Sequence, residues 1–132
     1  MADINWLAVL AAALSAFLLG GLWYSPALFQ KAWQRGAQIS DEELQKGGHP
    51  GKTYGGAFVL SLVAAATFAM FLGKPPVGEA TAYGFCVGLT WVAASFGINY
   101  LFERKTMTLF LVNGGYHTLQ FTLYGLILGL WH

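Results

Sequence analysis

The feature that most constrains the fold of this chain is a set of four long apolar runs without Asp, Glu, Lys or Arg. The runs cover about residues 4–24, 54–72, 80–102 and 107–131. A helix that crosses the hydrocarbon core of a bilayer, about 30 Å thick, needs about 20 mostly apolar residues. Because a charged side chain at the bilayer centre is costly, the lack of charges predicts a spanning helix for each run.

Composition supports this interpretation. Only 10% of the 132 residues are charged and 56% are hydrophobic, with a mean hydropathy of +0.53. A water-soluble domain has about 25% charged residues, so this chain has too few charges to cover a surface that faces water. We therefore predict an all-α fold, a membrane four-helix bundle that forms a single domain over residues 1–132. The net charge of +1 gives no basic surface for nucleic acid, and the expected partner is the lipid bilayer.

The distribution of Lys and Arg predicts how the chain is oriented. Six of the seven lie in the loop at residues 25–53 or between the third and fourth runs, and the seventh lies between the second and third runs. The six are Lys31, Arg35, Lys46, Lys52, Arg104 and Lys105, and the seventh is Lys74. Because cytoplasmic loops hold the positive excess, the loop at 25–53 should be cytoplasmic and both termini outside the cytoplasm. The first run lacks the positive start of a signal peptide, so we expect it to be retained.

The loop at residues 25–53 contains signals for short amphipathic helices. Ser25-Pro26 is a favoured helix start, and Leu28, Phe29 and Trp33 follow on one predicted face. This apolar face suits a helix that lies in the membrane interface. It suits equally a helix that packs on the cytoplasmic end of the bundle, and the sequence leaves both alternatives open.

A second short helix is predicted after the first. Ser40 and Glu43 have the spacing of a capping box, in which each side chain bonds to the backbone amide of the other residue. Gly47-Gly48 should end this helix, because glycine accepts the backbone conformation of a helix C-terminus. His49 follows, and we expect it to be a solvated side chain in the loop and not a ligand.

These residues resemble a known family. The order Trp23-Tyr24-Ser25-Pro26, Phe29 and Trp33, then Ser40-Asp41-Glu42-Glu43, together with four predicted spans, is similar to a family of small bacterial membrane proteins, domain of unknown function 1761. The resemblance covers most of the chain. It implies a multi-pass protein of the bacterial inner membrane, and it brings no catalytic motif.

Small residues at four-residue spacing recur in all four runs. In a bilayer, helices associate through close packing and hydrogen bonds, and small residues let the backbones approach. The rows are Ala8, Ala12, Ala16, Gly20; Ala57, Ser61, Ala65, Ala69, Gly73; Ala80, Gly84, Gly88; Gly114, Thr118, Thr122; and Gly125, Gly129. They predict a tight bundle, and rows left unused inside one chain could form a homodimer.

The fourth run carries an unusual polar stripe. Asn113, His117, Gln120 and Tyr124 are four, three and four residues apart, so they share one face of a helix. Polar groups that face lipid lose hydrogen bonds, so we expect this face to point into the bundle. Expected partners on the third run are Asn99 at the level of Asn113, Thr90 and Trp91 at the level of His117, and Ser95 between them.

The polar stripe allows two interpretations. It could hold the helices together through hydrogen bonds, or it could form a candidate intramembrane site of Asn99, Asn113, His117, Gln120 and Tyr124. The first interpretation predicts a non-enzymatic scaffold or interaction protein that uses the face of Leu28, Phe29 and Trp33. The second predicts a minimal transporter or channel for a small polar solute or a proton.

Enzymatic function ranks below both interpretations. No two of His49, His117 and His132 have the spacing of metal ligands, and Cys86 has no base at a defined spacing. We therefore expect no catalytic residue, no metal and no cofactor.

Overall fold

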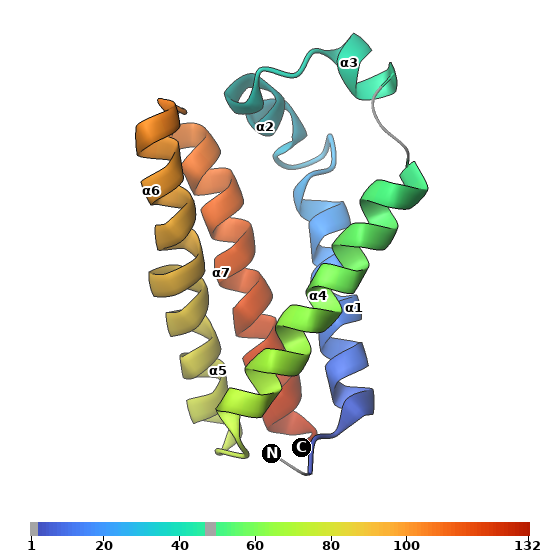
Figure 1. Cartoon of the computed structure of the whole chain (residues 1–132), viewed down its shortest axis with the longest axis vertical. Helices are drawn as coiled ribbons and strands as arrows, with labels where there is room; N and C mark the ends of the chain where they lie inside the picture. The colour runs from blue at the N-terminus through green and yellow to red at the C-terminus, as the bar shows by residue number, and fades with distance from the viewer. Residues whose placement is uncertain (1–2, 47–49) are drawn as a thin grey trace.

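The structure, a computed structural model, describes residues 3–46 and 50–132, and all the regular secondary structure in these residues is helical. The helices are α1 (Trp6–Trp23), α2 (Gln30–Ala37), α3 (Asp41–Lys46), α4 (Pro50–Leu72), α5 (Val77–Cys86), α6 (Ala94–Glu103) and α7 (Met107–Leu130). A π-helical segment, Val87–Ala93, joins α5 to α6 and makes one long helix of them (Figure 1). The all-α prediction is confirmed.

Three helices in the described part of the chain are long and apolar enough to cross a membrane. They are Trp6–Trp23, Pro50–Leu72 and Val77–Glu103. These helices match the first three apolar runs, although α4 begins at Pro50, four residues before the predicted start. Helix α7 has 24 residues and matches the fourth run in length, but its polar stripe makes it less apolar than the other three.

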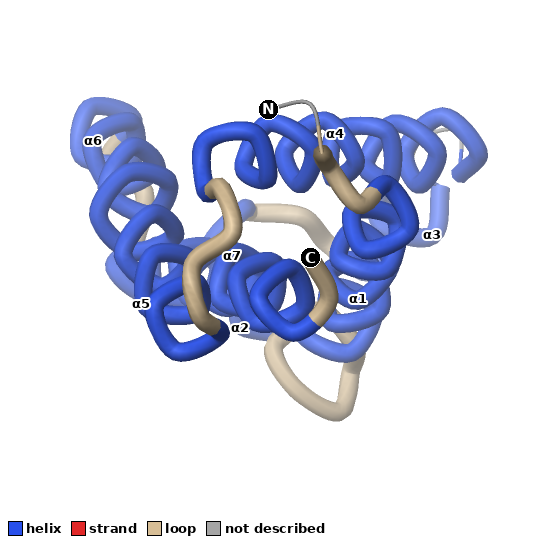
Figure 2. The backbone as a smooth tube through the Cα atoms, turned by 90° about the horizontal axis from the view of Figure 1, so that it is seen from below, coloured by secondary structure: helices blue, strands red, loops and turns tan. Residues whose placement is uncertain are grey.

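Helix α7 is the central helix of the fold. It packs against α1, α4, α5, the π segment and α6, and α2 contacts it near its N-terminus. Figure 2 shows α7 between α5 and α1, with α4 crossing beside them. The least apolar of the long helices is therefore the one most enclosed by protein, which allows its polar face to avoid lipid.

The contact between α5 and α7 depends on glycine. A Cβ atom added to Gly84 would lie 2.1 Å from the carbonyl oxygen of Phe121, and one added to Gly125 would lie 2.1 Å from the carbonyl oxygen of Ala80. Neither space admits a methyl group, so the two backbones are in direct contact. The small-residue rows predicted for the third and fourth runs pack against each other at this seam.

The π segment keeps this seam continuous. The small residues of this long helix that lie along α7 are Ala80, Gly84, Gly88, Ala93 and Gly97. Their spacing is four, four, five and four. In a regular α-helix a five-residue step would turn Ala93 about 140° away from Gly88. The hydrogen bonds of a π-helix join residues five apart, so Ala93 stays on the seam and contacts Gly114.

Large apolar side chains point outward along the long helices. Phe71, Leu101 and Phe102 are 91%, 81% and 86% exposed. They belong to a larger set of exposed large apolar side chains that occurs on all the long helices, and so much exposed apolar surface is rare on water-soluble monomers. Together with the three long apolar helices, it indicates that lipid surrounds the protein.

The predicted helix start at Ser25-Pro26 is wrong. The chain turns there, because the amides of Leu28 and Gln30 both donate to the carbonyl of Ser25, and α2 begins only at Gln30. Leu28 and Phe29 therefore lie in the turn and not on the helix.

The second short helix is confirmed. The amide of Glu43 donates to Ser40 Oγ at 3.1 Å, and the amide of Ser40 donates to Glu43 Oε1 at 3.4 Å. These two bonds form the predicted capping box at the start of α3. The predictions for Gly47-Gly48 and His49 lie outside the described residues.

Candidate functional site

The polar stripe of α7 divides into two hydrogen-bonded groups. The first begins at His117, whose Nδ1 lies 2.6 Å from Gln120 Oε1. Gln120 Nε2 donates to the hydroxyl of Tyr124 at 2.7 Å. The Tyr124 hydroxyl lies 2.6 Å from Ser61 Oγ on α4, and Ser61 Oγ donates to the carbonyl of Ala13 on α1 at 3.4 Å. This group joins α7, α4 and α1.

The first group is closed at its inner end. It terminates at a backbone carbonyl, and a Gln carboxamide interrupts it. Neither the backbone carbonyl nor the carboxamide takes up and releases a proton near neutral pH. Tyr124 is fully buried, and Gln120 and Ser61 are nearly so. The arrangement is suited to holding three helices in register and not to passing protons along the chain of bonds.

The second group is centred on Asn113. Asn113 Nδ2 donates to the Tyr100 hydroxyl on α6 at 2.7 Å, and Asn113 Oδ1 accepts from the hydroxyl of Tyr24 at the end of α1. One carboxamide thereby joins α1, α6 and α7. The predicted partner, Asn99, is exposed on α6 and lies outside both groups.

Aromatic rings enclose His117. Its imidazole stacks on Phe96 with ring centroids 4.8 Å apart and planes 11° apart, and Tyr116 meets its edge at 5.0 Å. The Tyr116 hydroxyl in turn donates to the carbonyl of Ala16 at 2.8 Å. His117 is therefore held by rings from α6 and α7 and by Gln120 on its own helix.

The expected partners of His117 on the third run are not the observed ones. Thr90 Oγ1 donates to the carbonyl of Cys86, and Ser95 Oγ donates to the carbonyl of Trp91. Both hydroxyls are exposed and bond to a carbonyl four residues earlier in their own helix, a bond that is always within reach of Ser and Thr. Trp91 is 70% exposed and forms no hydrogen bond with His117, whose ring nitrogen Nδ1 is paired with Gln120.

The predicted interfacial face packs on the bundle. The ring of Phe29 lies 4.6 Å from that of Trp23, and the ring of Trp33 lies 6.0 Å from that of Tyr24. Trp23 Nε1 also donates to the carbonyl of Val112 on α7 at 2.8 Å. Phe29 and Trp33 are half-buried, whereas Leu28 is 48% exposed. The sequence left open whether this face lies in the membrane interface or packs on the end of the bundle. Phe29 and Trp33 pack on the end of the bundle.

Helix α2 is held by a glycine as well. A Cβ atom added to Gly36 would lie 2.6 Å from Cβ of Leu109. The aromatic contacts at one end of α2 and this close approach at the other fix the helix across the start of α7.

Sequence reasoning missed four members of these groups. Ser61 stood in a row of small residues, Tyr24 in the family resemblance and Tyr116 beside the polar stripe, and Tyr100 lies near the end of the third apolar run. The available signal was that each of these positions carries a hydroxyl within an apolar run, which calls for a partner when buried.

The buried polar side-chain atoms of the described residues are all hydrogen-bonded. Every buried side-chain nitrogen and oxygen found there has a hydrogen-bond partner. In the same residues, no three His, Cys, Asp or Glu side chains lie together in a way that could hold a metal ion.

An apolar groove of about 710 Å³ runs between α4 and the α5–α6 helix. Phe68 of α4 and Phe121 of α7 meet edge to face at 5.6 Å beside it. The exposed Cys86 and Trp91 line the opposite wall. Lipid chains can fill such a lateral apolar groove.

Comparison with known proteins gives a family. The profile of the family described as "Protein of unknown function (DUF1761)" matches residues 7–129. No curated protein and no solved structure matches the chain.

Proposed function

We propose that this chain, which belongs to the DUF1761 family, is a four-span protein of the bacterial inner membrane that acts as a non-enzymatic scaffold. In this proposal, α2 and α3 form its interaction surface on the cytoplasmic side. Both termini lie outside the cytoplasm. The partner is a protein that contacts the charged outer surface of these two helices.

The enclosure of α7 supports a fourth span. The polar groups of α7 bond to Tyr100, Tyr24 and Ser61 inside the protein, so crossing the membrane exposes few of them to lipid. Lys31 and Arg35 lie on α2, and Arg104 and Lys105 lie between α6 and α7, at the same end of the molecule (Figure 1). This clustering favours a cytoplasmic position for that end.

The observation that carries the proposal is that α2 and α3 are held in place and yet exposed. Gln34 Nε2 donates to Asp41 Oδ1 at 2.9 Å and ties the two helices together. Helix α3 has no buried residue among those described. An ordered, charged element outside the apolar part of the protein is suited to bind another protein, because little ordering is required when it binds.

Photo-crosslinking tests this proposal. A photoreactive residue at Glu42 on α3 is compared with one at Glu79, which is exposed at the other end of the molecule. We expect one discrete protein adduct from Glu42 and none of that mass from Glu79. Replacing residues 41–46 with a Gly-Ser segment of equal length should abolish co-purification of that partner while the helical circular dichroism is kept. Unchanged co-purification would contradict the proposal.

The alternative function, a transporter or channel using the face of Asn113, His117 and Gln120, needs an open polar path. The imidazole of His117 stacks on Phe96 and meets Tyr116 edge to face, and this packing argues against such a path. Proton flux into proteoliposomes measures it directly. We expect the wild-type chain and His117→Ala to equal empty liposomes, and a wild-type flux that His117→Ala abolishes would replace the scaffold by the transporter.

A further inference from the structure

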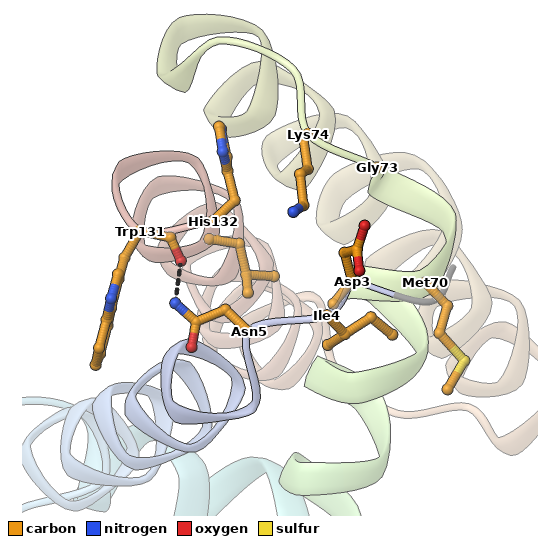
Figure 3. Close-up of a pocket in the computed structure, with 10 residues that line it drawn as sticks. Asp3, Ile4, Asn5, Met70, Gly73, Lys74, Trp131 and His132 are labelled. Carbon is orange, nitrogen blue, oxygen red and sulfur yellow. Dashed lines mark hydrogen bonds between the residues drawn. The ribbon is translucent and has the colours of Figure 1, made fainter.

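A small pocket lies at the end of the molecule opposite α2 and α3, where α1 begins and α7 ends (Figures 1 and 3). Its volume is about 230 Å³. Three segments that are distant in sequence build it: the start of α1, the end of α4 with the turn at Gly73-Lys74, and the end of α7. Ile4, Met70 and Leu128 give it an apolar wall.

Two opposite charges line this pocket without pairing. Asp3 and Lys74 both face it (Figure 3), and within the described residues neither forms an ion pair or a hydrogen bond. Lys74 is also the only Lys or Arg in the sequence placed at this end of the molecule. The two charges are therefore available to a ligand.

The neighbouring polar groups are already used within the protein. Asn5 Nδ2 donates to the carbonyl of Trp131 at 3.1 Å, and Asn5 Oδ1 accepts from the amide of Ala8 at 3.1 Å. The imidazole of His132 lies 3.0 Å from the carbonyl of Pro75. These bonds fix the wall of the pocket and leave recognition to Asp3 and Lys74.

We propose that this pocket binds a small zwitterion, a molecule that carries an ammonium group and a phosphate or carboxylate a few bonds apart. Lys74 Nζ donates to the anionic group, and the Asp3 carboxylate accepts from the ammonium. A simple anion would be attracted by Lys74 and repelled by Asp3, and a simple cation the reverse, because both charges line the same small pocket. Only a ligand with both charges gains from both residues.

Two sources offer this chemistry. One is the head group of phosphatidylethanolamine, with the exposed Trp131 at the depth where tryptophan meets lipid head groups and the apolar wall beside the glycerol. The other is a free zwitterion such as phosphoethanolamine. The site is independent of the proposed scaffold surface, which lies at the other end of the molecule.

Native mass spectrometry of the purified full chain tests the proposal. The chain is equilibrated with equal amounts of phosphatidylethanolamine and phosphatidylglycerol, and separately with free phosphoethanolamine. We expect the chain to retain either phosphatidylethanolamine or free phosphoethanolamine. In Asp3→Asn and in Lys74→Met, the affinity for the retained compound should fall about tenfold. Glu79→Gln and Lys105→Met, which remove exposed charges elsewhere, should retain it.

The two possible ligands, a lipid head group and a free zwitterion, predict different results. Lipid retention that free phosphoethanolamine does not displace identifies the head group, and binding of the free compound without lipid preference identifies a soluble ligand. Equal retention of both lipids with no binding of the free compound would overturn the proposal. Equal binding by the wild type, Asp3→Asn and Lys74→Met would also overturn it. Asp3 and Lys74 are exposed, so these variants should keep the wild-type melting temperature in detergent.

Discussion

At the scale of single residues, two kinds of contact hold the helices together. Glycines, which lack a side chain, let two backbones touch, and hydroxyl groups form hydrogen bonds with buried amides. Gly84 brings α5 against the backbone of α7, and Tyr124 connects Gln120 with Ser61. Both kinds of contact replace the hydrophobic effect, which does not drive association between helices in lipid.

The Gly84→Ala variant should be less stable. Its new methyl group would meet the carbonyl of Phe121, so α5 and α7 must separate, at a cost of about 1–3 kcal/mol. Gly78 on the same helix has nothing within 4 Å of an added Cβ atom, and Gly78→Ala is the matched control. Thermal unfolding in detergent, followed by circular dichroism, measures both. Equal melting temperatures for the two variants would contradict the close approach.

The Tyr124→Phe variant should also be less stable, by about 1 kcal/mol. Removal of the hydroxyl leaves Gln120 Nε2 without its acceptor and leaves Ser61 Oγ with only its long bond to the carbonyl of Ala13, and a buried donor without a partner is costly. Tyr83→Phe on the exposed side of α5 is the control and should be neutral. A double-mutant cycle with Gln120→Leu should show coupling, and strict additivity would mean that the hydrogen bond contributes nothing.

At the scale of elements, helix α2 is part of the packed structure. Trp23 and Tyr24 at the end of α1 hold Phe29 and Trp33, so the residues behind the family resemblance have a structural role in fixing α2. The proposed interaction surface then depends on this docking.

Removal of one docking ring should loosen α2. In Trp33→Ala we expect the amides of α2 to exchange hydrogen about tenfold faster, because the half-buried ring contributes about 1–2 kcal/mol. Leu28→Ala, which truncates an exposed side chain of the preceding turn, should leave exchange unchanged. Hydrogen–deuterium exchange of the protein in nanodiscs measures both variants. Equal exchange rates would indicate that α2 is held by other contacts.

At the scale of the whole molecule, three long apolar helices pack against α7, which carries the polar stripe. Helix α7 packs with every other long helix, and the outer helices present Phe71, Leu101 and Phe102 outward. The homodimer stays a prediction that the mass of the protein in nanodiscs would test.

Cysteine labelling tests the orientation of the whole molecule. Cys86 is the only cysteine, so Cys86→Ala provides a background for Lys46→Cys and Lys74→Cys. A membrane-impermeant maleimide added to intact spheroplasts should label Lys74→Cys and reach Lys46→Cys only after permeabilisation. The reverse pattern would place the cationic loops outside and remove α2 and α3 from the cytoplasm.

The sequence by itself determined the helical class, the length and position of the long helices, the capping box at Ser40 and the shared face of the α7 polar residues. These properties depend on local periodicity, apolar length and the chemistry of nearby residues, all of which are readable along the chain.

Only the tertiary structure decided which polar groups meet and where α2 lies. The partners of Asn113 are tyrosines from α1 and α6, and that of Tyr124 is Ser61 on α4. Asn99 stays outside because the π segment sets the register of α6 against α7. The sequence did not reveal this register, since close packing between distant helices, and not local preference, stabilises a π turn at Val87–Ala93.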